Sequence, residues 1–241
     1  MKKFFLLSIG VVLLFIALFL ATPTRTIGTG ILLGTDGRLI TLTHLVENAT
    51  DIIVKFPNAD DIRANKAIKA DSNLLSILQL ETSPKIERSL IRFSNSIEVK
   101  KGDYVFALFY PIANTQEDQH IAEEGNIISM DGTNGDKRVF QISFPIKPGQ
   151  SGAPVFNSNG EVIGFALTAQ DFEKVLDIKI ALSKEVGLVL KNSAINGFDK
   201  IISRNTRSAK SRPQRSLGLS KGLSYFKEGI QKNIVLIETG T

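Results

Sequence analysis

The chain has 241 residues, of which 43% are hydrophobic and 22% are charged, and its formal net charge is +5. This length and composition suit a globular protein with one sizeable domain, or with two small barrels that share an interface. Cysteine is absent, which excludes a disulfide framework and metal sites built on thiolates.

The positive charge is concentrated towards the C-terminus. Residues 200–221 contain seven basic residues and no acidic one. Outside this stretch the chain is close to neutral, so the net charge does not indicate a nucleic-acid-binding domain, and we expect no nucleic-acid partner. We interpret the stretch as a solvated linker. Contact of this stretch with an anionic membrane or with nucleic acid is the less favoured alternative.

The N-terminus carries an apolar segment. Lys2 and Lys3 precede a run from Phe4 to Ala21 that is about as long as the shortest membrane-spanning helices. Ala21 would suit the last position before a signal-peptidase cut, but Phe19 is bulky for the position two residues earlier. The pattern therefore favours an uncleaved signal anchor over a cleaved signal peptide for residues 1–24. The two lysines would stay in the cytoplasm, with the body of the protein outside it.

Short apolar or alternating runs, separated by turns rich in Gly, Asn and Asp, fill residues 26–180. Such runs are typical of antiparallel strands, and their spacing predicts an all-β sandwich or barrel pair rather than a parallel α/β sheet. The clearest runs are Gly28–Leu33, Leu39–Thr43, Asp51–Phe56, Leu74–Leu80, Tyr104–Tyr110, Asn126–Met130, Arg138–Ser143 and Val162–Thr168. The clearest helical stretch is Ser183–Asn192, with Ser183 as its N-cap.

The strongest chemical signal is Ser151, within the run Lys-Pro-Gly-Gln-Ser-Gly-Ala-Pro that ends at Pro154. A serine hydroxyl becomes a useful nucleophile when an imidazole can take its proton and backbone N–H groups can hold an oxyanion. His44 follows a strand-like run far upstream, and the order His then Ser is that of chymotrypsin-like proteases. The other histidine, His120, follows a polar stretch and is predicted to lie in a solvated loop.

Several motifs, in order, extend this signal. They are Gly-Thr-Gly-Ile at 28–31, Asp-Gly-Arg-Leu-Ile-Thr at 36–41 with Thr-His-Leu-Val at 43–46, Lys-Gly-Asp-Tyr-Val at 101–105, Glu-Gly-Asn-Ile-Ile-Ser at 124–129, residues 141–154 around the serine, and Gly-Glu-Val-Ile-Gly at 160–164. Together they resemble trypsin-like serine proteases of the HtrA type over residues 27–190. The resemblance implies an all-β fold of two six-stranded antiparallel Greek-key barrels, with the site between them.

The resemblance also implies roles for individual residues. Ser151 would be the nucleophile, His44 the general base, and the N–H groups of Gly149 and Ser151 the oxyanion hole. Four apolar residues would border the substrate pocket, with the latter two near the end of the second barrel: Phe144, Ile146, Ile178 and Ile180. No cofactor and no metal is expected.

The acid of the catalytic triad departs from the family pattern. An ungapped alignment places Leu74 where the acid belongs, and a shift of one residue places Asn73 there. Asp71 lies three residues earlier and could reach His44 only if its loop is rearranged. Replacing the acid by Asn in a trypsin-type site costs about 10⁴-fold in turnover. We therefore expect catalytic residues His44, Ser151 and Asp71, with a non-standard third member.

The C-terminal region, 197–241, is expected to be a basic linker and a short tail. The resemblance suggests a PDZ remnant at Arg215–Leu219 and Ile234–Glu238, but too few residues remain for a complete PDZ domain. The protease domain is thus expected at 25–196. Because family members often form trimers, a homo-oligomer is left open.

Three functions are consistent with the sequence. The favoured one is a serine endopeptidase anchored in a bacterial inner membrane, cutting polypeptides on the periplasmic or extracellular side, in protein quality control as the resemblance suggests. The alternative is a catalytically impaired pseudoprotease that acts as a peptide-binding scaffold, because Leu74 replaces the acid. The third is an adaptor that docks on anionic lipid through the basic stretch.

Overall fold

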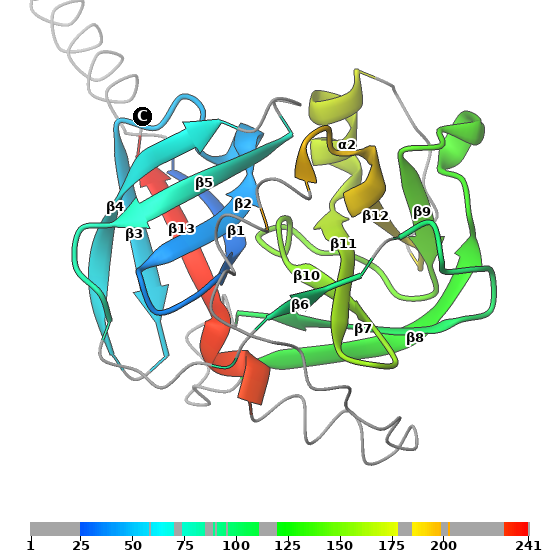
Figure 1. Ribbon diagram of the computed structural model, residues 1–241. Coiled ribbons are helices and arrows are strands. Elements are labelled where there is room, and N and C mark those ends of the chain that lie inside the picture. Colours follow the sequence, from blue (N-terminus) through cyan, green and yellow to red (C-terminus); the bar gives the residue numbers. More distant parts are fainter. Residues whose placement is uncertain are drawn as a thin grey trace, which may run out of the picture.

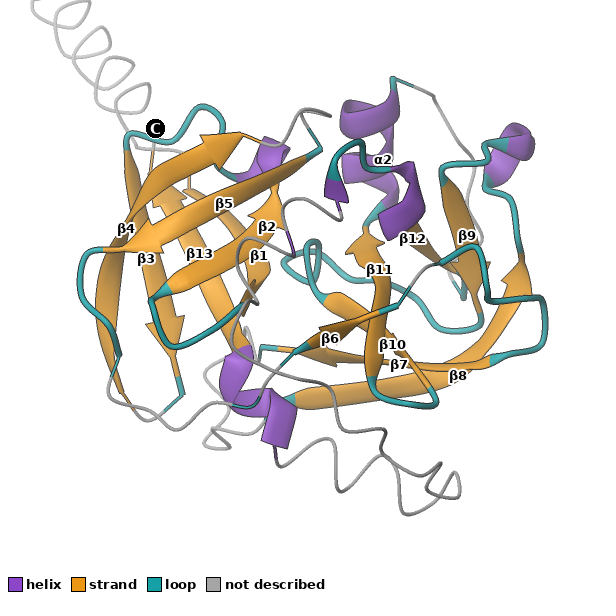
Figure 2. Ribbon diagram, viewed as in Figure 1, coloured by secondary structure: helices purple, strands orange, loops and turns teal. Residues whose placement is uncertain are grey.

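Two β-barrels lie side by side in the computed structural model (Figure 1). The structure describes residues 25–57, 59–69, 74–84, 89, 91–94, 96–110, 120–177, 185–198, 202 and 229–240. Strands dominate both halves, and helical segments are short and peripheral (Figure 2). The predicted all-β fold with two six-stranded antiparallel barrels is confirmed.

The first barrel is closed and has six strands, each antiparallel to its neighbours. In ring order they are β1 (Arg25–Leu32), β13 (Ile234–Gly240), β3 (Asp51–Phe56), β4 (Ala59–Lys69), β5 (Leu75–Leu80) and β2 (Arg38–Leu42). β13 comes from the C-terminal end of the sequence and lies between β1 and β3, in red in Figure 1. Its register against β1 begins with Arg25 opposite Gly240.

The position of β13 corrects the expectation for the C-terminal region. We expected a tail after residue 196 and a PDZ remnant at Ile234–Glu238, whereas Ile234–Gly240 is a strand of the first barrel. Its physical basis is a run of apolar side chains, Ile234–Ile237, whose exposed fractions are 7% or less. The other segment assigned to the remnant, 215–219, lies outside the described residues.

Asn233 and His120 fix the start of β13. Asn233 is fully buried, and its Nδ2 donates to the carbonyl oxygens of Leu32 and Ser89, 3.0 Å away in each case. Nε2 of His120 lies 2.9 Å from the carbonyl oxygen of Ile234, and the ring packs edge-on against Tyr110. His120 is only 3% exposed, so the prediction of a solvated loop residue is wrong.

The second barrel is also a ring of six antiparallel strands. In order they are β10 (Pro154–Asn157), β7 (Tyr104–Phe109), β8 (Ile121–Ser129), β9 (Val139–Ile142), β12 (Gly187–Lys191) and β11 (Glu161–Leu167), and β11 closes the ring on β10. The short strand β6 (Arg92–Phe93) adds to β11 in parallel.

The helical segments differ from the sequence expectation. The α-helix α2 spans Ala169–Leu176, directly after β11. The predicted helix at Ser183–Asn192 is wrong, because Gly187–Lys191 is strand β12. A side chain at Gly187 would lie 2.5 Å from the carbonyl oxygen of Phe144, so this glycine lets two chain segments approach closely. The 3₁₀ segments are η1 (Thr43–Leu45), η2 (Thr133–Gly135), η3 (Asn192–Ala194) and η4 (Gln231–Asn233).

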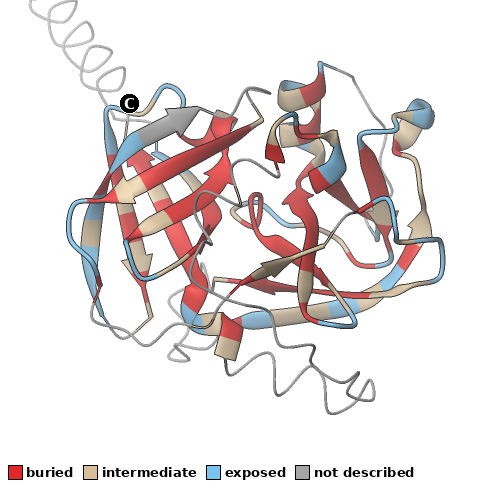
Figure 3. Cartoon of the chain, in the orientation of Figure 1, coloured by how far each residue is buried: buried red, intermediate tan, exposed pale blue. Residues whose placement is uncertain are grey.

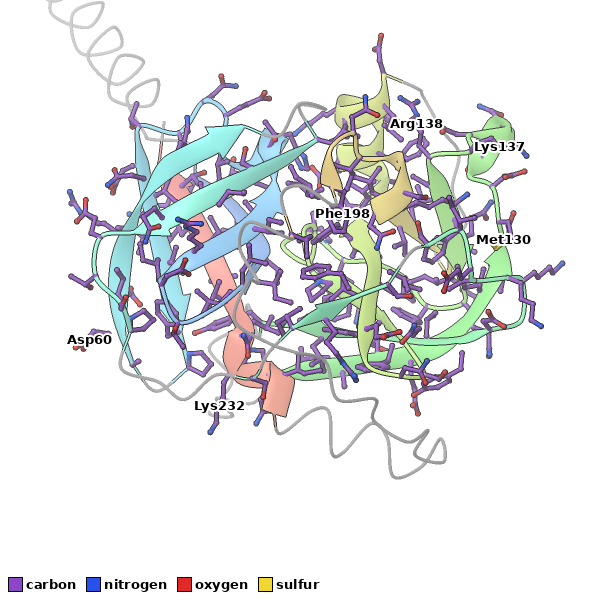
Figure 4. All side chains as sticks on the ribbon, viewed as in Figure 1. Asp60, Met130, Lys137, Arg138, Phe198 and Lys232 are labelled. Carbon is purple, nitrogen blue, oxygen red and sulfur yellow. The ribbon has the colours of Figure 1, made fainter. Side chains whose placement is uncertain are left out.

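The core is continuous between the barrels. Buried residues occur along the strands of both halves (Figure 3). One apolar cluster includes β1 and β2 side chains together with Phe165 and Leu190 of the second barrel. Phe198 adds edge-on contacts to Phe93 and Phe165, and side chains fill the space around it (Figure 4). Because apolar burial contributes about 25 cal/mol per Å², this shared core favours a fixed relation between the barrels.

Candidate active site

Ser151 lies in the loop between β9 and β10, where two glycines shape the backbone. Gly149 and Gly152 have φ angles of 83° and 87°, a region that residues with a side chain rarely adopt. Gly152 also faces the first barrel, since a Cβ there would lie 2.3 Å from the carbonyl oxygen of Thr29. The serine is therefore presented by a turn that is pressed against β1.

Hydrogen bonds fix both the backbone and the hydroxyl of Ser151. The N–H of Thr29 donates to the Ser151 carbonyl oxygen at 2.8 Å, which joins the two barrels at this point. Oγ of Ser151 accepts a hydrogen bond from the N–H of Thr168 at 3.0 Å and donates its own proton to Oδ2 of Asp171. Only 1% of the serine is exposed, and these two hydrogen bonds hold its hydroxyl in one orientation.

His44 lies in η1, directly after β2 of the first barrel. Thr43 anchors this segment: its N–H donates to the Leu74 carbonyl oxygen at 2.9 Å, and its hydroxyl is hydrogen-bonded to that of Ser76 at 3.0 Å. Nε2 of His44 is 3.1 Å from Oδ1 of Asp171. The contact lacks hydrogen-bond alignment, and within the described part of the chain neither ring nitrogen has an aligned partner. Nδ1 is therefore available to a further acceptor.

Asp171 bridges the serine and the histidine from the first turn of α2. Thr168 is the N-cap of this helix, and its hydroxyl accepts from the Asp171 N–H at 3.1 Å and donates to Oδ2 at 2.6 Å. Burial raises the pKa of Asp171, but the contacts from His44, Ser151 and Thr168 outweigh it and hold the pKa at about 2. The side chain is consequently a carboxylate at neutral pH, close to the positive end of the helix dipole.

The amides that could hold an oxyanion belong to the serine itself and to the residue two positions before it. Within the described residues, the N–H groups of Gly149 and Ser151 form no hydrogen bond. The loop is braced by other contacts: Gln150 N–H donates to the Lys147 carbonyl oxygen at 3.0 Å, and Thr29 Oγ1 donates to the Gly149 carbonyl oxygen at 3.2 Å. Two unpaired donors beside a serine suit a developing negative charge on a substrate oxygen.

The structure brings some of the predicted site residues together. Ser151 and His44 meet through Asp171. Phe144 is 4% exposed and belongs to the core of the second barrel, with Ile146 packed against the same core. Asp71, Ile178 and Ile180 lie outside the described residues. No cluster of His, Asp and Glu suited to a metal ion occurs among the described residues.

Asp171 was not predicted from the sequence, although a local signal was present. Thr168-x-x-Asp171 matches the capping pattern in which a Ser or Thr precedes an acidic residue by three positions. That pattern predicts a helix start after the strand Val162–Thr168. It does not indicate that the acidic side chain reaches a serine and a histidine in other segments.

The sequence model of the trypsin-like peptidase domain matches residues 28–165. The chain belongs to this family. A probable periplasmic serine endoprotease, DegP-like, of Ectopseudomonas mendocina is 31% identical over 68% of the chain and 34% of its own length. An uncharacterized protein of Sinorhizobium fredii is 27% identical over 71% of the chain and 26% of its own length. The chain thus spans about a quarter to a third of these relatives.

Solved structures share the fold. The HtrA-type protease AlgW, with a decapeptide or with a tripeptide, superposes with TM-scores of 0.54 and 0.55 at 18% identity. Each comparison covers 74% of this chain and 52% or 56% of the other. With the DegP-like relatives, this agreement confirms the resemblance to HtrA-type proteases. No helix in the described part of the chain is long and apolar enough to cross a membrane, and the predicted anchor, 1–24, lies outside that part.

Proposed function

We propose that the protein is a serine endopeptidase that cuts polypeptides through an acyl-enzyme. The observation that carries the proposal is that the Ser151 hydroxyl and the His44 imidazole contact the same carboxylate, while two amides of the serine loop are unpaired. These are the parts that acyl transfer needs: a nucleophile, a base and donors for the oxyanion.

The reaction would proceed in two stages. Oγ of Ser151 attacks the scissile carbonyl carbon while Nε2 of His44 takes the hydroxyl proton, and the carbonyl oxygen becomes an oxyanion held by the N–H groups of Gly149 and Ser151. His44 then gives the proton to the leaving amine as the peptide bond breaks. Water, activated in turn by His44, hydrolyses the ester and frees the serine.

The third catalytic residue is proposed to be Asp71. A triad acid acts on Nδ1 of the imidazole, and this nitrogen has no partner among the described residues. Residue 74, three positions after Asp71, is hydrogen-bonded to Thr43, the neighbour of His44. If Asp71 orients the ring, Asp71→Asn lowers kcat by up to about 10⁴-fold. An unchanged kcat in this variant would remove Asp71 from the mechanism.

We further propose that the protease domain acts outside the cytoplasm, tethered to the inner membrane of a bacterium by residues 1–24. Relatives described as periplasmic endoproteases and the apolar run from Phe4 to Ala21 support this location. N-terminal sequencing of the protein recovered from membranes tests the tether. A mature chain that begins near Thr22 would show that the segment is removed.

Cleavage of an unfolded protein tests the activity. The full chain, purified in detergent, should release fluorescent peptides from fluorescein-labelled casein, and Ser151→Ala should abolish the release. Ser158→Ala is a matched control, because Ser158 is exposed in the turn between β10 and β11 and should change nothing. Release that persists in Ser151→Ala would contradict the proposal.

A second candidate is a pseudoprotease that binds peptides without efficient turnover. It is favoured by Leu74 in the position of the acid and by the Ser151 proton, which is directed at Asp171 rather than at His44. Labelled casein also separates the two functions. A scaffold immobilised on a column would retain casein, and it would release no fluorescent peptides from it.

A further inference from the structure

The Asp171 carboxylate occupies the space between the two catalytic groups. Its Oδ2 accepts the proton of Ser151, while its Oδ1 lies 3.1 Å from Nε2 of His44. A serine hydroxyl has a single proton to donate. While that proton is given to Asp171, it cannot be given to His44, so the pair is not poised for nucleophilic attack.

We propose that Asp171 is an autoinhibitory latch, which holds Ser151 in an unreactive state until a substrate displaces the carboxylate. This inference rests on the proposed function of Ser151 and His44. It assigns to α2 a role in controlling access to the serine, in addition to its place in the fold.

The chemistry of the reaction supports the assignment. Hydrolysis of an acyl-enzyme leaves a carboxylate beside the serine oxygen and the imidazole Nε2. It lies beside the serine oxygen because the acyl carbon was bonded to that oxygen, and beside Nε2 because Nε2 activated the attacking water. The two oxygens of Asp171 contact these same two atoms. The side chain therefore stands where the new carboxylate of a cleaved chain would stand, and it competes with substrate in the manner of a product.

The latch is held by contacts that do not depend on a substrate. Thr168 Oγ1 donates to Oδ2 at 2.6 Å, and the N–H of Asp171 donates back to the same hydroxyl at 3.1 Å. Thr168 is itself 7% exposed, and α2 contacts η1, which carries His44. The anion is thus fixed by a capped helix start that reaches from the second barrel to the histidine of the first.

A role for Asp171 as the general base is less consistent with its surroundings. Its pKa of about 2 makes the carboxylate a weak acceptor for a serine proton, since proton transfer is most effective when the pKa of the base is near the working pH. The low pKa also keeps the latch ionised at neutral pH. Release must then come from displacement by a substrate chain rather than from protonation.

The rate of covalent labelling by a fluorophosphonate tests the latch. The full chain is compared with Asp171→Ala and with Asp177→Asn at pH 7.5. Asp177 terminates α2 in a left-handed conformation that Asn also adopts, so Asp177→Asn is a control for a charge lost from the same helix. Circular dichroism and thermal melting establish that each variant is folded.

Asp171→Ala should label at least about tenfold faster than the parent, because one charge-assisted hydrogen bond to Ser151 accounts for a factor of that size. Asp177→Asn should label at the parent rate. With casein, Asp171→Ala should raise kcat/KM, whereas loss of a positioning residue would lower kcat.

The outcomes distinguish the latch from the function on which it rests. Equal or slower labelling of Asp171→Ala would overturn the latch, and labelling of the parent at Ser151 would still support the peptidase. Absence of labelling in the parent and in both folded variants would overturn the peptidase, and the latch with it.

Discussion

Oδ1 of Asp171 lies 3.1 Å from Nε2 of His44, although the two residues come from different barrels. The same carboxylate accepts the Ser151 hydroxyl proton, so one side chain spans both groups on which acyl transfer would depend. In the chymotrypsin arrangement the acid acts on Nδ1, the far nitrogen of the ring. Asp171 is on the nucleophile side of His44, which fits a competitor of substrate better than the acid of the triad.

The acid stability of the protein should depend on Asp171. Its pKa is about 2 in the folded protein and near 3.8 when unperturbed, so the folded state favours the carboxylate. The resulting stabilisation is fully present above about pH 4 and is lost as the pH falls through 2. Thermal melting of the parent and of Asp171→Asn between pH 2 and pH 6 measures it. The parent should be the more stable at pH 6, and the two melting curves should converge towards pH 2; a constant difference would contradict this origin.

The N-cap of α2 should contribute to the stability of the protein. Thr168→Val removes the hydroxyl that caps the helix and that is hydrogen-bonded to Asp171, and it should lower the free energy of unfolding by about 1 kcal/mol. Thr168→Ser keeps an oxygen at this place and should restore most of the loss. Urea denaturation of the three proteins provides the comparison. A Ser variant as unstable as the Val variant would show that the methyl group, not the cap, matters.

Gly152 should be essential to the presentation of Ser151. An added Cβ would lie 2.3 Å from the Thr29 carbonyl oxygen, and the φ angle of 87° is itself unfavourable for alanine. We expect Gly152→Ala to lower stability by about 2–4 kcal/mol and to abolish labelling of the serine.

A matched control separates crowding from backbone strain at this position. Gly102 has a φ angle of 94°, but a Cβ there meets nothing within 4 Å. Gly102→Ala should therefore cost only about 1 kcal/mol and leave the labelling rate unchanged. Equal losses in the two variants would contradict the proposed contact between the serine turn and β1.

Asn233 should hold β13 in the first barrel. Its buried side chain donates to the carbonyl oxygens of Leu32 and Ser89 and accepts from the Ser89 N–H, so Asn233→Ala leaves several buried groups unpaired. At about 1–3 kcal/mol for a buried group without its partner, the total loss should be about 3 kcal/mol. Relative to the parent, hydrogen exchange in Asn233→Ala should accelerate more in β13 than in β7, which lies in the other barrel. Uniform exchange changes would indicate that β13 has no separate dependence on Asn233.

The sequence predicted the parts of the fold that local patterns encode. All eight strand runs that were named overlap observed strands, because apolar alternation and turns act over a few residues. The place of β13 could not be predicted in this way. Its pairing of Gly240 with Arg25 joins the two ends of the described chain, and no local signal indicates which barrel edge a distant strand will complete.

In the candidate site, too, the residues within local motifs could be predicted, whereas those brought together by packing could not. Ser151, Gly149 and His44 lie in short motifs that carry their chemistry in the neighbouring residues, so they could be named in advance. Asp171 lies in a helix that begins after β11, and its meeting with His44 depends on how the barrels pack. The helix predicted at Ser183–Asn192 depends on a local capping signal at Ser183, which does not exclude a strand that begins at Gly187. The role of Gly187 is the close approach of β12 to Phe144.

Whether Ser151 is a nucleophile is measured by the mass of the protein after treatment with a fluorophosphonate. The parent and Asp171→Ala should each gain one adduct, the variant faster, and peptide mapping should place it on Ser151. Ser151→Ala should gain none. A folded parent and a folded Asp171→Ala that both remain unmodified, or an adduct that maps to another residue, would show that Ser151 is not the nucleophile.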